Sequence, residues 1–278
     1  MTFEDKLAWL KSSCERASKT LIEDAYSVRY ERKKKSLGAV LSSMASNHER
    51  LGVYAYFAES NLAEMKQHFY VVAKLNIASV GLRWGETLSS TTDFLYIMLS
   101  DSPEVIKAYA SLEPEEYLKN RENPRVMAFL VHMYQLALRG EHDALRVKIA
   151  IAAQKSGQKL REEFSAGEDF FSLLLKRDKS ALEALITKKA NQWQAIIKKG
   201  GETGTPLSEN LMASIAMEYA KLCWLKGIEV EIDHPLIPME LLPIKPLTHY
   251  DDVYDFLDPN WQPPPQGFID KVANFFKR

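Results

Sequence analysis

An arginine and a histidine separated by six residues are the strongest candidates for chemistry in this sequence. They are Arg125 and His132, which open and close the segment RVMAFLVH. On a helix, an arginine can hold a phosphate group while a histidine exchanges a proton, so such a pair could cleave RNA. The alternative is that Arg125 is exposed in the first helical turn and His132 packs on the helix flank. We favour this alternative, because short patterns of this kind recur by chance.

The spacing of the pair resembles a motif of helical HEPN-type ribonucleases, in which four to six residues separate an arginine from a following histidine. In those enzymes the residue after the arginine is usually polar, whereas here it is Val126. The resemblance implies an RNA-cleaving activity, which we keep as a minor hypothesis.

Other catalytic and cofactor signatures do not occur in the sequence. The six histidines are scattered and the cysteines Cys14 and Cys223 lie far apart, so no zinc motif forms. No glycine-rich phosphate loop follows a strand pattern. The segment SGQK at 156–159 fits a serine-hydrolase pattern but lacks its companion motifs. We therefore expect no metal, no cofactor and no enzymatic activity.

Composition and charge indicate an ordinary globular protein. The chain has 278 residues, 46% of them hydrophobic, and a net charge of -1. The basic run RYERKKK at 29–35 is an isolated feature, and nucleic-acid binding needs a broader basic surface. The first residues contain early acidic side chains and no long apolar run. We expect a cytoplasmic protein that binds neither nucleic acid nor a membrane, with both cysteines buried and reduced.

The spacing of apolar residues predicts helices through most of the chain. Apolar residues recur at steps of three and four from Phe3 to Val28, and Thr2 with Asp5 forms a capping-box pattern before them. We expect a second helix over 32–48 and a third that runs from Tyr54 to Leu75 and ends in GLRWGE.

The prolines separate two parts of the chain. Three early prolines follow good N-cap residues, in Ser102-Pro103, Asn123-Pro124 and Thr205-Pro206, and predict helix starts. Eight of the twelve prolines lie between Pro235 and Pro265, where they exclude a long helix.

A faint repeat of 37 residues relates LALRGEHDAL at 136–145 to LLLKRDKSAL at 173–182. Each copy is typical of a helix, a tight polar turn and a second helix. The repeat favours stacked helical hairpins, and the alternative is two ordinary hairpins with similar turns.

These patterns predict an all-α fold, an antiparallel helical bundle with stacked helical hairpins plus an extended Pro-rich C-terminal arm. We expect a helical domain over residues 1–227, then an arm with short C-terminal helices over residues 228–278 that packs on the same domain. IEVEI at 228–232 alternates as a strand would, but we expect it to lie extended across helices. The arm from Ile228 to Leu247 should be pinned by three apolar residues, Ile237, Leu241 and Leu242.

The start of the arm resembles a known family. A helix ends in GIEVEI, and apolar residues come next around IPMELL. This arrangement, over Ala213 to Leu242, resembles the C-terminal end of the immunity protein 49 family of bacterial polymorphic toxin systems. The resemblance implies a non-enzymatic antidote that binds a cognate protein toxin and neutralises it in the cytosol. A helical-repeat adaptor that binds other proteins is the alternative.

A contact surface for that toxin is predicted in THYDDVYDFLD, which combines aromatic and acidic side chains without a basic residue other than a histidine. Aromatic anchors and charge complementarity are typical of tight interfaces. The predicted toxin-binding residues are Tyr250, Asp251, Asp252, Tyr254, Asp255 and Asp258. The alternative, which we favour, is that the aromatic residues pin a short helix onto the bundle while the aspartates cap it or face water. Trp84 is likewise assigned to the core.

Overall fold

The computed structural model describes residues 2–30, 36–83, 85–155, 170–199, 211–258 and 260–262. Within these ranges the fold is all-α and contains no strand, as predicted. A further helical segment spans residues 170–176. The helices are α1 (Phe3–Tyr30), α2 (Leu37–Phe57), α3 (Leu62–Ser79), α4 (Thr92–Leu99), α5 (Pro103–Ala110), α6 (Glu115–Asn120), α7 (Met127–Arg139), α8 (His142–Lys155), α10 (Lys179–Lys198), α12 (Ser214–Leu225), and the 3-10 turns η1 (Met239–Leu241) and η2 (Asp255–Leu257).

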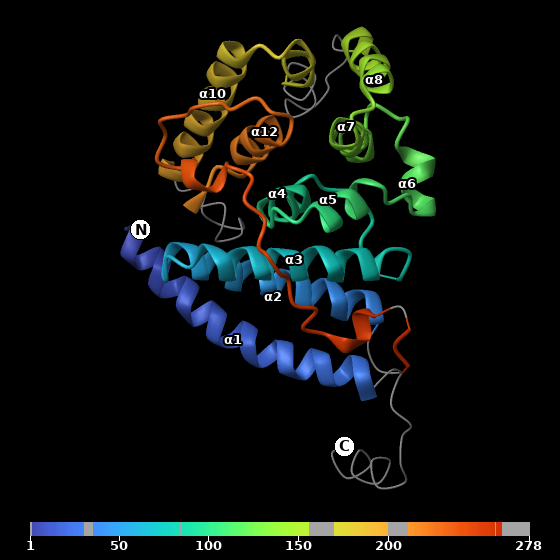
Figure 1. Ribbon diagram of the computed structural model, residues 1–278, viewed down its shortest axis with the longest axis vertical. Helices are drawn as coiled ribbons and strands as arrows, with labels where there is room; N and C mark the ends of the chain where they lie inside the picture. Colours follow the sequence, from blue (N-terminus) through green and yellow to red (C-terminus); the bar gives the residue numbers. More distant parts are fainter. Residues whose placement is uncertain are drawn as a thin grey trace, which may run out of the picture.

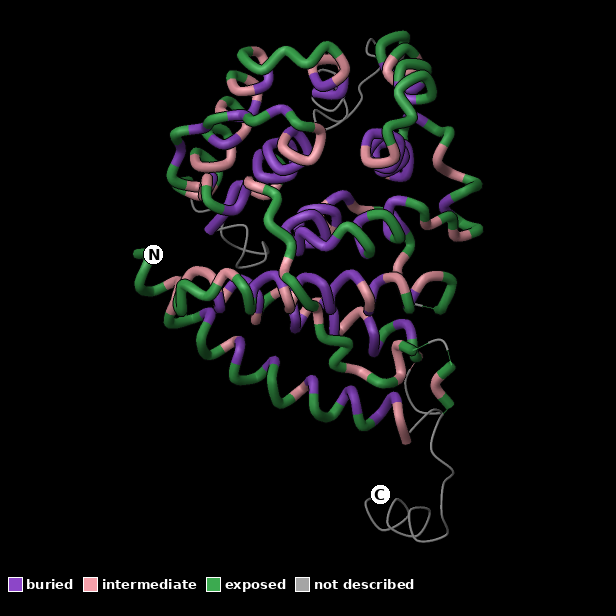
Figure 2. The backbone as a smooth tube through the Cα atoms, viewed as in Figure 1, coloured by how far each residue is buried: buried purple, intermediate pink, exposed green. Residues whose placement is uncertain are grey.

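The helices are stacked in layers along the long axis of the molecule (Figure 1). α1, α2 and α3 pack in sequence order at one end, and α3 in turn contacts α4 and α5. α12 packs on α4 and α7 packs on α5, which places α8 and α10 at the opposite end. α4, α7 and α12 are buried on most sides, whereas α1 is buried on one side only (Figure 2).

The first helix confirms the sequence prediction. Its capping box is formed, because the Asp5 backbone N donates to Thr2 Oγ1 at 3.1 Å and the Thr2 backbone N donates to Asp5 Oδ2 at 2.8 Å. Cys14 in α1 and Cys223 in α12 are buried free thiols, as expected.

The predicted helix from Tyr54 to Leu75 is in fact two helices. α2 continues to Phe57, and α3 begins at Leu62. Ser60 has a φ of 53°, and the side chain of Asn61 accepts a hydrogen bond from the Glu64 backbone N at 3.1 Å. A capped turn therefore separates two helices. The apolar spacing continues on both sides of the turn because each helix buries one face. The predicted end near GLRWGE is correct, since α3 stops at Ser79; Trp84 lies outside the described residues.

The proline predictions had different outcomes. Pro103 is the first residue of α5 and Ser102 is its N-cap, as predicted. Asn123-Pro124 does not start a helix: these residues form a turn, and α7 begins at Met127 with Val126 as N-cap. Thr205-Pro206 lies outside the described residues.

The 37-residue repeat reproduces one turn twice. Gly140 and Arg177, which are 37 positions apart, have φ values of 75° and 55°. The next residues, Glu141 and Asp178, donate from their backbone N to Leu136 O and Leu173 O, at 2.9 and 3.2 Å. In both copies the first helix thus ends at a residue in the left-handed backbone conformation, and a second helix follows.

Arg177 takes a conformation that normally favours glycine. Its guanidinium group binds the end of α12, because Nη1 donates to Lys226 O at 2.9 Å and Nη2 donates to Gly227 O at 2.8 Å. These bonds satisfy carbonyl groups that a helix terminus leaves open, which explains why an arginine is used at this turn.

Residues 228–258, which we call the arm, run from the last helices back to the first three (Figure 1). Ile228, Val230 and Ile232 are buried and the glutamates between them are exposed, so IEVEI lies extended over α10 and α12 as predicted. Trp224 Nε1 donates to Val230 O at 3.0 Å. The three predicted pinning residues, Ile237, Leu241 and Leu242, are all buried in the core.

A buried triad of charges attaches the middle of the arm to the helices. Asp101 lies between two lysines, with Lys66 Nζ 2.8 Å from Oδ2 and Lys221 Nζ 2.6 Å from Oδ1. Lys221 also donates to Leu241 O at 2.8 Å, and Lys66 donates to Lys245 O at 2.6 Å. The triad therefore links α3, the α4–α5 turn and α12 to backbone oxygens of the arm.

We predict that Asp101→Asn lowers the free energy of unfolding by about 3–5 kcal/mol, because it leaves two buried lysines without a counter-charge. Asparagine tolerates the φ of 58° found at this position, so the substitution tests charge and not backbone strain. Urea titration measures the change.

The control is Asp143→Asn, which removes an exposed ion pair with Arg146 and should change stability by less than about 1 kcal/mol. Equal effects of the two substitutions would contradict the assigned role of the triad.

Candidate functional site

The six predicted toxin-binding residues lie on the last part of the arm, where it crosses α3, α2 and α1 (Figure 1). Tyr250 stacks on Tyr70 with ring centroids 4.9 Å apart, and its hydroxyl donates to Ser100 O at 2.5 Å. Its oxygen also accepts from the Leu247 backbone N at 3.1 Å. The ring of Tyr250 is thus used inside the fold.

Tyr254 ends a chain of hydrogen bonds between three aromatic side chains. Its hydroxyl lies 2.8 Å from His48 Nε2, and His48 Nδ1 lies 2.9 Å from His68 Nδ1. Burial lowers the pKa of His48 to about 3 and that of His68 to about 4. Both imidazoles are therefore neutral at pH 7, so each ring has one nitrogen that donates a hydrogen bond and one that accepts a hydrogen bond.

The arm aspartates have their carboxylates directed towards solvent. We call Asp251, Asp252, Asp255 and Asp258 the acidic cluster. Asp252 contacts Lys74 at 3.2 Å and Asp255 contacts Arg29 at 2.7 Å, yet their side chains remain 57% and 56% exposed. Asp251, 74% exposed, pairs with His249 at 3.1 Å. These carboxylates remain accessible to a partner.

The arm has a 3-10 turn, η2, at the place where a short helix was expected. Tyr250, Tyr254, Phe256 and Leu257 all pack against the core. The structure therefore assigns a packing function to the aromatic residues, and the toxin-binding function of the six residues stays a prediction.

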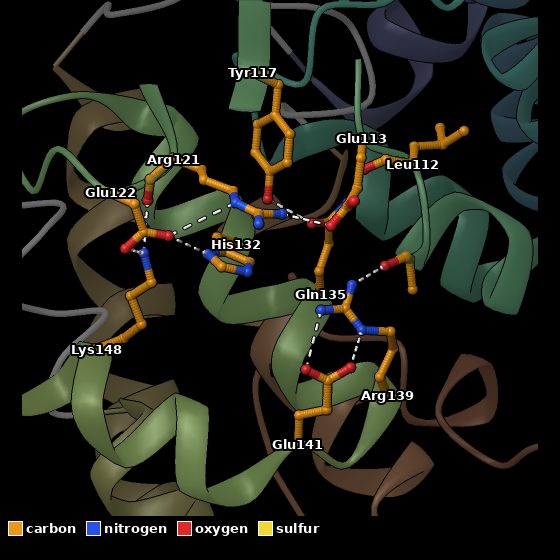
Figure 3. Close-up of polar contacts among 11 residues, drawn as sticks. Leu112, Glu113, Tyr117, Arg121, Glu122, His132, Gln135, Arg139, Glu141 and Lys148 are labelled. Carbon is orange, nitrogen blue, oxygen red and sulfur yellow. Dashed lines mark hydrogen bonds and ion pairs between the residues drawn. The ribbon is translucent and has the colours of Figure 1, made fainter. Parts of the chain in front are cut away.

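Arg125 and His132 occupy different environments. Arg125 lies in the turn before α7, is exposed, and donates its backbone N to Asn123 Oδ1 at 3.1 Å. His132 is only 7% exposed, inside α7, with Nδ1 3.6 Å from Glu122 Oε1 (Figure 3). The expected single helix that would carry both residues begins after Arg125.

His132 belongs to a network of charges between α6, α7 and α8. Glu122 also binds Lys148 Nζ at 2.7 Å and lies 3.6 Å from Arg121 Nε (Figure 3). Burial, followed by the charges of Lys148 and Arg121, lowers the pKa of His132 to about 4. The imidazole is neutral at pH 7, and the contacts drawn in Figure 3 tie these helices together.

A polar cavity of about 150 Å³ lies between α2, α3 and the segment that leads into α4. It is lined by the carboxylates Glu49, Glu86 and Asp93. Burial and the neighbouring carboxylates raise the pKa of Glu49 to about 8 and that of Asp93 to about 7. Within the described residues, no group of three or more histidine, cysteine or acidic side chains is placed to hold a metal ion.

A larger cavity, which we call the Glu218 pocket, has a volume of about 370 Å³ and lies between α4, α7, α10 and α12. Its walls are mostly apolar and include Leu130, Trp193 and Tyr219. Glu218 is 1% exposed, and its Oε2 accepts from Tyr134 at 3.3 Å. Burial raises the pKa of Glu218 well above its usual range, which favours the protonated carboxyl.

Comparison with known proteins identifies the family. The family model described as Immunity protein 49 matches residues 59–241, about two thirds of the chain. The chain belongs to the immunity protein 49 family. No curated protein and no solved structure matches the chain.

The family match separates the two candidate surfaces. The residues that line the Glu218 pocket lie between Ser90 and Tyr219, inside the matched range. The acidic cluster begins at Asp251, after the matched range ends at Leu241. The pocket therefore lies in the part of the chain that matches the family model, and the acidic cluster lies outside that part.

Glu218 is not among the predicted site residues, although the sequence contains a signal for it. Glu218 lies in AMEYAKLCWL, where every other residue except Lys221 is apolar. A lone charge within an apolar helical run predicts a buried, functional or paired group. Lys221 is paired in the triad, whereas Glu218 lines a pocket.

The histidine pair should make stability depend on pH. In the unfolded chain His48 and His68 take up protons near their ordinary pKa of 6.5, whereas in the folded chain the pKa is about 3 for His48 and about 4 for His68. Their stabilising contribution is therefore complete above pH 6.5 and is lost as the pH falls towards 4. We predict that the free energy of unfolding of the wild type falls over that interval more steeply than that of the double variant His48→Gln/His68→Gln. The difference is up to roughly 1.4 kcal/mol per pH unit for each histidine.

Urea titrations at several pH values measure this difference. His142→Gln, at the exposed start of α8, is the control and should behave as wild type does. Parallel pH curves for wild type and the double variant would contradict the prediction.

We also predict that the purified chain leaves RNA intact, since His132 is buried in a charge network and Arg125 precedes its helix. Incubation with structured and single-stranded RNA, followed by gel electrophoresis, tests this. Cleavage that disappears in both Arg125→Ala and His132→Ala would establish the ribonuclease hypothesis instead.

Proposed function

We propose that this chain is a cytoplasmic antidote that binds a cognate antibacterial protein toxin and neutralises it without catalysis. The observation that carries the proposal is the match of the immunity protein 49 family over residues 59–241, which indicates an immunity function. The toxin as partner, the block of its activity and the cytosol as the site of action are our inferences from that membership.

The described residues support a binding function. His132 is buried in a charge network with Glu122 and Lys148, whereas Arg125 is exposed and precedes the helix that carries His132. No helix in these parts of the chain is long and apolar enough to cross a membrane. The stacked helices present side-chain surfaces on a rigid support, which suits recognition of another protein.

The direct test is co-expression with the toxin encoded beside this chain's gene. We expect the toxin alone to stop growth of a host strain and the pair to grow normally, with a stable complex recovered by size-exclusion chromatography. Cell death despite abundant folded antidote would refute the proposal.

We further propose that the acidic cluster contributes to capture of the toxin, because its carboxylates are exposed and attract a basic surface from a distance. Conversion of its four aspartates to asparagine should slow association, most strongly at low salt. Stopped-flow kinetics measure the rate.

The matched control removes four exposed acidic charges elsewhere, at Glu115, Glu116, Glu141 and Asp143. An association rate that falls equally in both variants would show that only net charge matters. An unchanged rate in the first variant would exclude the acidic cluster from capture.

A further inference from the structure

The Glu218 pocket contains buried oxygen atoms that the described part of the chain does not satisfy. Glu218 Oε1 and Ser214 Oγ are both inaccessible to water and make no hydrogen bond there. A buried polar atom without a partner is destabilising. Both residues line the same cavity, so a group that enters the pocket would complete their hydrogen bonds.

The walls of the pocket determine the kind of group that fits. Leu130, Trp193 and Tyr219 form an apolar lining, and the volume of about 370 Å³ lies at the small end of the range of ligand sites. This space suits one large side chain with an apolar body and a polar tip that reaches Glu218. Anchor residues of protein interfaces fill pockets of this kind.

The hydrogen-bonding capacity of a carboxyl distinguishes between aromatic side chains. A carboxyl accepts hydrogen bonds in either protonation state and also donates one when it is protonated, so a group that both donates and accepts satisfies it in both states. The tyrosine hydroxyl does both, whereas the tryptophan indole N–H only donates and phenylalanine does neither.

The rim of the pocket is basic. Gln192 and Ile196 of α10 line the mouth, and helix periodicity places Lys188, Lys189 and Lys199 on the same face. Lys189 itself lines the pocket. Since α10 has no acidic residue after Glu183, this face complements an acidic segment of a partner.

We propose that the Glu218 pocket receives a tyrosine side chain from an acidic segment of the toxin, with the ring against Trp193 and the hydroxyl hydrogen-bonded to Glu218 Oε1. This inference rests on the proposed function. The pocket and the acidic cluster lie in opposite halves of the molecule (Figure 1), so separate variants measure their contributions.

The first experiment measures toxin affinity by calorimetry with purified, folded variants. Glu218→Met keeps the length of the side chain but removes its polar atoms. It should raise the melting temperature by about 2 °C or more, because an unsatisfied carboxyl is lost, while weakening toxin binding at least tenfold. A residue with only a structural role would not show opposite changes in stability and binding.

A second variant closes the pocket from outside. Gln192→Trp, at an exposed position on the mouth, should weaken binding at least tenfold without changing stability. Asn191→Trp is the matched control: it adds the same side chain to the neighbouring exposed position, which does not line the pocket, and should bind as wild type does.

The second experiment tests the pocket without the toxin. p-Cresol has the structure of the tyrosine side chain. In NMR spectra of the isolated protein it should shift the indole N–H resonance of Trp193 in a saturable manner. That resonance is assigned as the one that Trp193→Phe removes. Toluene, which lacks the hydroxyl, should bind more weakly, and Gln192→Trp should abolish the p-cresol shift.

The outcomes separate this inference from the proposed function. A wild type that protects cells and binds toxin, with both pocket variants binding equally well, overturns the inference and leaves the function intact. Absence of saturable p-cresol binding also overturns it, whatever the toxin assay gives. A wild type that neither binds nor protects refutes the proposed function, and the inference falls with it.

Discussion

The ion triad of Lys66, Asp101 and Lys221 is the interaction on which the rest of the structure depends. Three elements that are distant in sequence meet at Asp101, and the same two lysines donate to carbonyl oxygens of the arm. Those carbonyl groups have no helical partner, because prolines prevent the arm from forming a helix. The lysines thus satisfy the carboxylate and the arm backbone together, which joins the packing of α3 and α12 to the position of the arm.

Attachment of the arm at the triad determines the path of its last residues. From Lys245 the arm continues over α3, α2 and α1, where Tyr250, Tyr254 and Asp255 contact Tyr70, His48 and Arg29. Residues more than 200 positions apart are therefore in contact, and the first helix is fixed by nearly the last described segment. The aromatic side chains point inward, and the carboxylates beside them remain hydrated. The exposed surface of the arm is therefore acidic and has few apolar anchors.

The helices, the capping box of α1, the repeated turn and the buried arm residues were all predictable, because each depends on local spacing or turn chemistry. The break between Phe57 and Leu62 was missed because apolar spacing continues across it. The prediction that Asn123-Pro124 starts a helix was wrong, because a dipeptide that favours a helix start also forms turns. The groups that face Asp101 and Glu218 could not be predicted, because the sequence shows a charged residue but not which distant residues it contacts.

Glu218 and the triad show two different uses of buried charge in α12. Lys221, one turn after Glu218, has its ammonium group fully satisfied by Asp101 and by carbonyl groups of the arm. Glu218 retains an oxygen without a hydrogen-bond partner among the described residues, and burial raises the pKa of its carboxyl. A methionine would fit the same helix without that cost, so packing alone gives no reason for a carboxyl at this position. The oxygen that the described residues leave without a partner is explained if the toxin supplies the hydrogen bond, as we propose, at a wall of the pocket where an apolar anchor would also find a hydrogen bond.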